Sequence, residues 1–559
     1  MFHMTSAAQD ALTRTISRSP WHGWGDPADA HPLPDRSWTM LRRELGVTRR
    51  PQPTGPVALE DVRLPESRLA PDDLAALRAV VGTAYVHTDR LARVEHAAGK
   101  SYLDLRRLRE GDAADAPDVV LTPADATEIE QLLSVCRDRR LAVVPFGGGT
   151  SVVGGVTGSP GPFAAAVSID LRRLNRMLSI DPVSRTAVFQ PGMRGSDVEG
   201  ALRPHGFTLG HYPQSHQEAT IGGYVATRSA GQASTGYGRI DEIVRGATLA
   251  TPEGTLRLDM RAPASAAGPR LLDLVVGSEG ALGIITEVTM AIAPMPSQTA
   301  YAALAFPSFG EAAEGLRSLA QDLPHGIRPD VVRLSDPDET RVSLGLAGRA
   351  GQALAAYTKA RRLPAACLVV LLWEGNDART LRERKAASWE VLRRAGAVRM
   401  PSAIAHAWEK GRFSGPYLRD ELMGHGVLVE TLETATSWAN LVALHDRVAA
   451  AIRAVSADQG VPVIVQCHVS HVYPTGASLY FTVVAPEAAD PLAQWRAIKT
   501  AATAAIVAGG GTVTHHHAVG TDHVDGLAAE VGELGMRVLR AVKDTLDPTG
   551  ILNPGKLVR

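Results

Sequence analysis

Three adjacent glycines, Gly147 to Gly149, follow a short apolar run that ends at Phe146. Glycine has no Cβ, so a run of three lets the backbone turn sharply and lay its N–H groups against an anion such as a pyrophosphate. Thr150 and Ser151 add hydroxyl donors directly after the turn. The loop has neither the GxGxxG spacing of a Rossmann turn nor the lysine of a P-loop. Taken alone, such a triplet is more often a flexible turn, so its meaning depends on what accompanies it.

Three later segments also combine glycine with small polar residues. They are PQSHQEATIGG at 213–223, ATRSAG at 226–231 and GSEGALGIIT at 277–286. Each could be an ordinary turn. All four segments, in this order and at these separations, are hard to obtain by chance. They predict turns that converge on one large ligand.

The length and composition limit the class of protein. A chain of 559 residues is too long for one core and predicts two or more domains. The formal net charge of -1 gives no field of one sign, so charge does not indicate nucleic acid as a partner. Three widely spaced cysteines form neither a disulfide framework nor a metal pair, which favours a reducing compartment. With no signal peptide and no apolar run of roughly 20 residues, we expect a cytoplasmic protein, and peripheral membrane contact stays open.

The order of apolar runs predicts an α+β protein in four parts. Residues 1–114 form an extension and a helical segment, which includes an amphipathic helix opened by Pro71. Residues 115–295 alternate strands and helices, with strand, helix and strand before the glycine triplet. Residues 296–500 hold β-rich runs between long helices, which predicts a cap with a largely antiparallel sheet. Residues 501–559 carry three histidines and a terminal NPGK, and are expected to return to the second part.

The glycine-rich segments and the terminal NPGK resemble the FAD domain of the vanillyl-alcohol-oxidase and para-cresol-methylhydroxylase (PCMH) superfamily. This resemblance implies a PCMH-type FAD-binding domain beneath an α+β cap. It places the first loop on the FAD pyrophosphate and the turns at 214–220 and 279–285 along the isoalloxazine and adenosine. The cofactor-binding residues that it implies are Pro145, Phe146, Gly147, Gly148, Gly149, Thr150, Ser151, Gln214, Ser215, His216, Ala219, Thr220, Gly222, Gly223, Thr227, Arg228, Ser229, Glu279, Gly280, Leu282, Gly283, Ile284 and Ile285.

The link to FAD is expected to be non-covalent. Some members of the superfamily bond FAD through a histidine just after the first glycine pair. This chain has Gly149 and Thr150 at that point, although a distant residue such as His516 could take the same part.

Further segments resemble the alkyldihydroxyacetonephosphate synthase family in particular, from about residue 20 to the end. They are WHGWG at 21–25, GH at 210–211, RLSD at 333–336, YLRD at 417–420, ETLET at 430–434, ASLYF at 477–481 and HHHAVG at 515–520. That family replaces the fatty acid of acyl-dihydroxyacetone phosphate by a fatty alcohol, without net redox change of the flavin. The resemblance therefore implies an ether lipid precursor as product, a lipid-like substrate and a homodimer.

Residue roles follow from the same resemblance. Tyr480 is expected to transfer the proton, with Arg419 as the phosphate clamp. The implied catalytic residues are Tyr480, His515, His516, His517 and Arg419. The implied substrate-binding residues are Arg419, Arg333, His211, His468 and His471.

The residues themselves leave structural explanations open. An arginine is more often part of an ion pair, and a tyrosine in a β-branched strand is more often core. The phenol of Tyr480 can exchange a proton if a neighbour lowers its pKa. Three consecutive histidines point in different directions, so they form a weak metal site and we predict no metal.

One segment departs from the synthase pattern. His468 and His471 are paired where the eukaryotic synthases have no paired histidines, so they could join the active site or bind a metal. FAD-dependent D-2-hydroxy-acid dehydrogenases of the same superfamily hold a metal with histidines from this region. They carry GDGN and Glu-His-Gly patterns, which this chain lacks, so a dehydrogenase of the D-lactate or D-2-hydroxyglutarate type is the alternative function. A flavin-binding scaffold without activity would have lost these polar cap residues.

Overall fold

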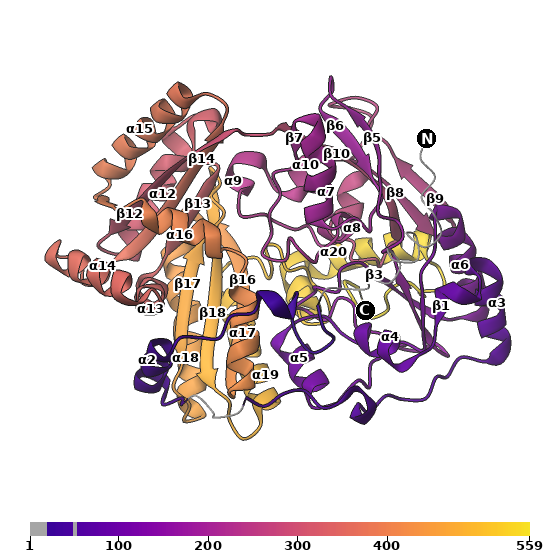
Figure 1. Ribbon diagram of the computed structural model, residues 1–559. Coiled ribbons are helices and arrows are strands. Elements are labelled where there is room, and N and C mark those ends of the chain that lie inside the picture. Colours follow the sequence, from indigo (N-terminus) through magenta and orange to yellow (C-terminus); the bar gives the residue numbers. More distant parts are fainter. Residues whose placement is uncertain (1–18, 49–52, 559) are drawn as a thin grey trace.

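The computed structural model describes residues 19–48 and 53–558 of the chain. Two lobes stand side by side in Figure 1, one built on two smaller sheets and the other on one large sheet. This mixture of helices with parallel and antiparallel strands confirms the α+β class. The first 18 residues, which bear on the expectation that there is no signal peptide, lie outside the described part of the chain.

A four-stranded sheet carries the glycine triplet at the end of one strand. Its strands, in sheet order, are β1 (Val86–His87), β2 (Val119–Leu121), β4 (Ala166–Asp170) and β3 (Ala142–Phe146). The last three are parallel. Helix α6 (Ala126–Arg139) begins where Asp125 accepts the N–H of Glu128, and its buried side chains recur at helical spacing. The strand, helix and strand predicted before Gly147 therefore all form.

A five-stranded antiparallel sheet completes this lobe. Its strands, in sheet order, are β5 (Met177–Asp181), β6 (Thr186–Phe189), β10 (Ile284–Ala291), β8 (Val244–Thr251) and β9 (Gly254–Leu258). The short helices around it are α7 (Gly195–Leu202), α8 (Ile221–Ala226), α9 (Ser234–Tyr237), α10 (Ile240–Ile243) and α11 (Leu272–Val275). A separate ribbon pairs β7 (Phe207–Thr208) with β11 (Ala293–Pro294). Most of the sheet and four of the helices share one apolar core, which fixes the loops between them.

The large sheet of the other lobe has seven strands, and every described neighbouring pair is antiparallel. In sheet order they are β15 (Val398–Met400), β12 (Gln298–Phe306), β14 (Cys367–Gly375), β13 (Val331–Ser335), β17 (Ile464–Val469), β18 (Gly476–Pro486) and β16 (Val427–Ser437). Its helices are α12 (Phe309–Asp322), α13 (Pro337–Leu346), α14 (Gly348–Ala360), α15 (Ala378–Arg394), α16 (Ala403–Gly411), α17 (Gly415–Gly424), α18 (Leu441–Asp458) and α19 (Pro491–Ala508).

One face of this sheet is covered by helices, and around Tyr480 of β18 the other face carries polar side chains. Leu479 and Phe481 of β18 share an apolar core with residues of α12, α15, α18 and α19. Because side chains alternate along a strand, the intervening Tyr480 points to the opposite face. The largest core of the molecule thus fixes the direction of this tyrosine.

The N-terminal extension binds both lobes. Helix α2 (Asp35–Leu45) packs on β16, β17 and β18, and the N–H of Trp24 donates to Asp420 at 2.7 Å. Helices α3 (Pro71–Val81), α4 (Arg90–Glu95) and α5 (Tyr102–Arg109) follow. The helical segment expected within residues 1–114 is interrupted at Val86–His87, because these residues add an edge strand to β2.

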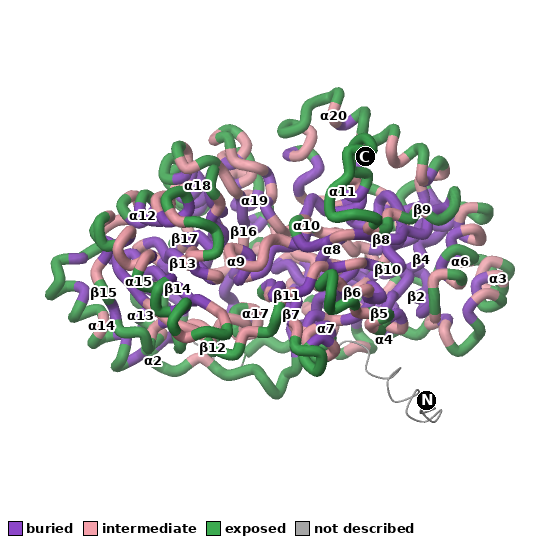
Figure 2. Tube along the Cα trace, turned by 90° about the horizontal axis from the view of Figure 1, so that it is seen from above, coloured by how far each residue is buried: buried purple, intermediate pink, exposed green. Residues whose placement is uncertain are grey.

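The C-terminal segment returns to the first lobe. Helix α20 (Val524–Leu546) is interrupted at Gly532, which has a φ of 72°, and Figure 2 shows this helix largely exposed. Beyond it, the carbonyl of Ile551 accepts from Val143 at 2.8 Å and the N–H of Asn553 donates to Val143 at 2.7 Å. The tail therefore pairs with the strand that precedes the glycine triplet. Across the described residues no helix combines the length and apolarity needed to cross a membrane.

Candidate active site

The glycine-rich segments pack against one another. A Cβ on Gly148 would lie 2.1 Å from the carbonyl oxygen of Glu218, and a Cβ on Gly147 would lie 2.5 Å from Oγ1 of Thr220. Gly280, with a φ of 72°, lies against Pro145 in the same way. These close approaches require glycine, because any side chain would separate the loops.

The first loop has the donors that an anionic group needs. The backbone N–H groups from Gly147 to Ser151 have no acceptor among the described residues. Two buried polar atoms of the other glycine-rich segments, Nδ1 of His216 and Oγ of Ser278, also lack a hydrogen-bond partner among the described residues. Consecutive free N–H groups in a glycine turn suit a pyrophosphate, so the residues present fit a dinucleotide.

The other residues predicted to bind the cofactor divide into two groups. Thr220 caps α8, and Ser229 bonds Nε2 of His211 at 3.1 Å, so both lie on segments that border the loop. Ile284 and Ile285 instead pack in the apolar cores, and Arg228 pairs with Asp241. The side chains of this second group are already engaged within the protein.

Glu279 has a structural task that the sequence did not reveal. Its carboxylate accepts the N–H groups of Val519 and Gly520 at 2.8 and 2.7 Å. Asn553 of the terminal NPGK donates to the carbonyl oxygen of Glu279 at 2.6 Å. Burial raises the pKa of Glu279 to about 7. This side chain thus fastens the C-terminal segment to the glycine turn, which differs from the expected direct contact with the cofactor.

Tyr480 lies at the centre of the polar face of the large sheet. It pairs with His468 on β17 and with Glu433 on β16. The ring of His468 stacks on it at 4.7 Å, and the rings of His516 and His517 lie 5.9 and 5.5 Å away. The structure therefore brings Tyr480 together with His468 of the neighbouring strand and with two histidines of the C-terminal segment.

The environment of Tyr480 keeps its phenol protonated. Burial raises the pKa of this group to about 12, despite a hydrogen bond with Thr431. The condition that a neighbour lowers this pKa is not met, since desolvation outweighs the available partners. A phenol in this state donates a proton, and becomes a base only after giving that proton up.

A buried carboxylate positions the histidine turn. Glu433 accepts the backbone N–H groups of His515, His516 and His517 at 2.6, 3.1 and 2.9 Å. It also accepts the hydroxyl of Thr514 at 2.5 Å. Although burial opposes ionisation, the adjoining histidine turn holds the pKa of Glu433 well below its usual range. One side chain therefore fixes three successive residues of the turn.

Arg333 does not present a free cation. It donates to Glu339 at 2.6 Å, and Glu339 also lies 2.9 Å from Nδ1 of His468. Burial would raise the pKa of Glu339, but the Arg333 guanidinium holds it well below its usual range. The resulting triad supports His468 beneath Tyr480, so the structure places Arg333 behind the site.

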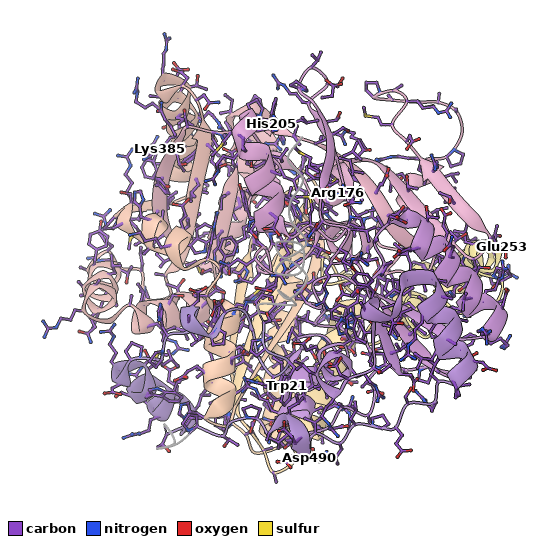
Figure 3. All side chains as sticks on the ribbon, turned by 45° about the vertical axis from the view of Figure 1, so that its right-hand side comes forward. Trp21, Arg176, His205, Glu253, Lys385 and Asp490 are labelled. Atoms are coloured by element: carbon purple, nitrogen blue, oxygen red, sulfur yellow. The ribbon has the colours of Figure 1, made fainter. Side chains whose placement is uncertain are left out.

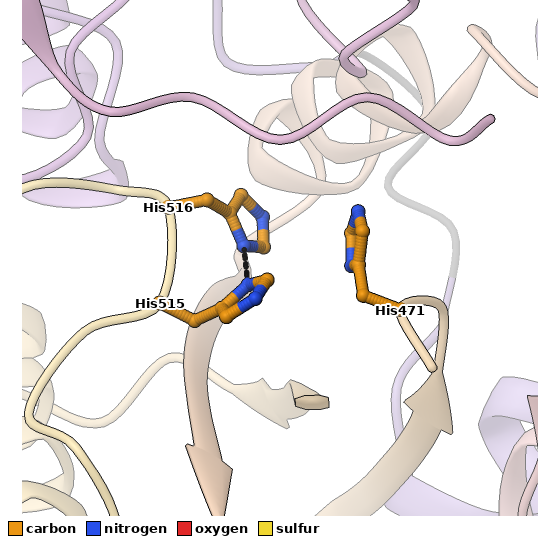
Figure 4. A group of neighbouring side chains, drawn as sticks. All are labelled: His471, His515 and His516. Atoms are coloured by element: carbon orange, nitrogen blue, oxygen red, sulfur yellow. Dashed lines mark hydrogen bonds between the residues drawn. The ribbon is translucent and has the colours of Figure 1, made fainter. Parts of the chain in front are cut away.

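His471 lies beside two histidines of the turn, His515 and His516, as Figure 4 shows. Nitrogen atoms of His471, His515 and His516 lie within 4.8 Å of one another, a spacing that could hold a metal ion. His471 donates from Nε2 to the carbonyl of Gly231 at 3.0 Å. The hydroxyl of Tyr473 lies 2.7 Å from Nε2 of His515, whose Nδ1 lies 2.9 Å from Nδ1 of His516. Tyr473, His515 and His516 thus form a hydrogen-bonded chain that can pass a proton in either direction.

Two further predicted residues, Arg419 and His211, have other hydrogen-bond partners. The guanidinium of Arg419 donates to Asp420 at 3.0 Å and to the carbonyl of Lys100 at 2.5 Å. The N–H of Lys100 donates to Ser151, so Arg419 lies near the end of the first glycine loop. His211 is buried beside Ser229 and its Nδ1 has no described partner.

Sequence reasoning missed Glu433, Glu339 and Tyr473 as members of the site. Glu433 was hidden because the histidine turn that it binds lies over 80 residues away in the chain. For Glu339 the distant partner is His468, which is 129 residues away. The one available signal was an acidic residue within an otherwise apolar strand, which normally requires a buried partner.

The buried histidines predict a specific acid sensitivity. Burial lowers the pKa of His211, His516 and His523 to about 3 and that of His216 and His517 to about 4. Between these values and the unfolded pKa of about 6.5, the unfolded chain binds more protons, so stability falls as pH falls. We expect the free energy of unfolding to fall by about 1.4 kcal/mol per pH unit for each such group between pH 6.5 and 4.5, and the urea midpoint to fall with it.

Urea titrations followed by tryptophan fluorescence test this slope. The paired carboxylates cannot cause it, because their contribution is lost only as the pH falls below about 4.3. His523→Asn should reduce the slope by about one proton. A midpoint that stays constant from pH 6.5 to 4.5 would contradict buried neutral histidines.

Comparison with known proteins agrees with this geometry. Residues 117–258 match the family "FAD binding domain" and residues 295–557 match "FAD linked oxidases, C-terminal domain". The chain is 31% identical to the alkyldihydroxyacetonephosphate synthase of Dictyostelium discoideum, over 96% of this chain and 93% of the relative. It is also 31% identical to that of Trypanosoma brucei brucei, over 98% and 93%. A solved structure of alkyldihydroxyacetonephosphate synthase superposes with a TM-score of 0.83 at 29% identity, covering 99% of this chain and 100% of the other.

The fold and the cofactor follow from these matches. The first lobe is a PCMH-type FAD-binding domain and the second is its α+β cap, as the sequence predicted. FAD is the cofactor that such a domain binds. The chain therefore belongs to the alkyldihydroxyacetonephosphate synthase family of FAD-dependent enzymes.

Proposed function

We propose that the protein exchanges the acyl chain of acyl-dihydroxyacetone phosphate for a fatty alcohol and so makes an ether lipid precursor. The observation that carries this proposal is the placement of Tyr480 between His468 and Glu433, facing the histidine turn. Near full-length similarity to relatives named as synthases supports the same reaction. The glycine loop that fits FAD belongs to the adjoining lobe.

Each residue then has a chemical role. FAD, when bound, supplies the ring at which the carbon skeleton of the substrate reacts, without net redox change. Tyr480 donates a proton, because its pKa of about 12 keeps it protonated at neutral pH. His515 and Tyr473 return the proton through their hydrogen-bonded chain.

The anionic end of the substrate needs a cation. Arg419 remains the proposed phosphate clamp, since a guanidinium can bind phosphate with two parallel hydrogen bonds. Its present partner is Asp420, so phosphate would have to compete with that carboxylate. Non-covalent FAD, a homodimer, a cytoplasmic location and the absence of a metal also belong to this proposal.

A transfer assay tests the function. Purified protein should be yellow, and acid precipitation should release the flavin into solution. Incubation with acyl-dihydroxyacetone phosphate and labelled fatty alcohol should give labelled ether product and one equivalent of free fatty acid. D-lactate and D-2-hydroxyglutarate, with and without a chelator, serve as comparison substrates. Rapid flavin bleaching by either hydroxy acid, with no ether product, would overturn the synthase proposal and favour the dehydrogenase.

A further inference from the structure

A cavity of about 350 Å³ lies at the edge of the large sheet, far from the glycine loops. It is half open to solvent and is bordered by β12, β14, β15 and α15, and its apolar lining includes Leu304, Leu371, Trp373, Trp389 and Met400. The space would hold on the order of ten waters, but apolar walls offer them few hydrogen-bond partners. An apolar occupant therefore suits this cavity better than water.

The cavity is separate from the candidate active site. It borders β12, and the strands from β12 to β18 lie in the order β12, β14, β13, β17 and β18. Four steps of about 4.8 Å give roughly 20 Å between the two strands. Leu304, Leu371 and Trp373 also share the helix-covered core with Leu479 and Phe481, whereas Tyr480 points to the other face.

Three cations line the same cavity. They are Arg382, Lys385 and Arg399, and none of them forms an ion pair with a carboxylate among the described residues. Figure 3 labels Lys385 on the outer part of this lobe. The outward arginines of α15 behave differently, since Arg379 pairs with Glu383. Arg382, Lys385 and Arg399 are themselves exposed, so they form an unpaired cationic rim of the cavity.

The arrangement of these groups favours a bound anion. Arg382, Lys385 and Trp389 are spaced by three and four residues, so they share one face of α15. Lys385 donates to the carbonyl of Tyr301 at 2.6 Å, and the Arg399 guanidinium lies 4.2 Å from the centre of the Trp389 ring. Like charges gathered at one cavity repel one another, and an anion would relieve that repulsion.

One buried donor in the wall also lacks a partner. Trp373 is 1% exposed, and its indole N–H has no acceptor among the described residues. Trp373 pairs with Ala300, next to the Tyr301 carbonyl that Lys385 contacts. An oxygen at this end of the cavity could therefore accept from the indole and face a cation.

We propose that this cavity binds the carboxylate form of a free single-chain fatty acid. The chain occupies the apolar space under α15, and the carboxylate is held by Arg382, Lys385 and the N–H of Trp373. A fatty alcohol of the same length lacks the charge and binds weakly. The same class of molecule is the leaving acid of the proposed exchange, but this inference rests on the cavity alone.

Titration of the FAD-loaded full chain with dodecanoate and dodecanol, followed by tryptophan fluorescence, tests the proposal. Dodecanoate should bind at least ten times more tightly than dodecanol. The double variant Arg382→Glu with Lys385→Glu should weaken dodecanoate binding at least ten-fold. The matched control, Arg394→Glu with Arg317→Glu, makes the same change of charge at two surface arginines outside the cavity lining, and should bind as the wild type does.

A photoreactive fatty acid locates the occupant. It should label residues 378–394, and Tyr480→Phe should retain that labelling. Equal binding of alcohol and acid, unchanged binding by the cavity variant, or labelling confined to the histidine turn would each overturn the proposal. Attachment to anionic phospholipid vesicles without dodecanoate binding would also overturn it. None of these outcomes depends on ether product, so the proposed function is tested separately.

Discussion

Replacing Glu433 by alanine should destabilise the protein by about 3–5 kcal/mol, because the change leaves a buried histidine turn without its acceptor. Glu433 is 4% exposed, and its carboxylate accepts hydrogen bonds from three backbone N–H groups and one hydroxyl. Water cannot easily replace it at that depth, so each donor would bear part of its desolvation cost. Urea unfolding at pH 7.5 measures the loss.

Glu433→Gln separates charge from shape. The glutamine side chain has the same volume, but only its amide oxygen can accept hydrogen bonds. Its NH2 group would face backbone donors that it cannot satisfy. We expect a smaller loss of stability and a turn that no longer holds His516 against Tyr480, so transfer activity should fall together with it. The matched control is Glu530→Gln, an exposed glutamate that bonds Val513 of the same segment at 2.8 Å. It should change stability by less than about 1 kcal/mol.

Equal effects of the two glutamine variants would contradict the positioning role of Glu433. They would show that packing positions the histidine turn and that the carboxylate of Glu433 does not. Loss of flavin in Glu433→Gln at unchanged urea midpoint would instead move the residue into the cofactor site.

The local parts of this architecture could be predicted because their causes are local. Helix α6 forms over the predicted segment, with Asp125 as its cap. The glycine triplet follows β3 because three residues without Cβ permit its close approach to Glu218. Neither feature requires knowledge of the partner strands.

The sequence could indicate which residues belong to the candidate site, but it could not indicate which of them are neighbours in space. Period-two alternation puts Tyr480 on the face opposite Phe481, but its neighbours depend on register with β16 and β17. That register arises from pairing between segments 12 to 47 residues apart, which no local pattern encodes. Arg333 was expected at a substrate, and the structure pairs it with Glu339, which lies close to it in the chain.

Tyr480→Phe removes one oxygen and is expected to lower the transfer rate by about 10²–10⁴. The ring still stacks on His468 at its present distance of 4.7 Å, so the cap should keep its packing. Flavin content and urea midpoint should match those of the wild type, because Tyr480 contacts neither the glycine loops nor the apolar core. The measurement is the single-turnover rate at saturating substrate, which separates proton transfer from binding.

A buried tyrosine elsewhere provides the comparison. Tyr102 is 1% exposed and its hydroxyl donates to Glu487 at 2.7 Å, in a part of the fold away from the histidine turn. Tyr102→Phe should cost about 1 kcal/mol of stability and leave the rate unchanged. If both variants turn over at the wild-type rate, the proton must come from another group, and the hydrogen-bonded pair His515 and His516 becomes the first alternative. If Tyr480→Phe keeps its rate in acid and loses it only at higher pH, the phenol is one of two parallel donors, because a neutral imidazole there gains its proton only in acid.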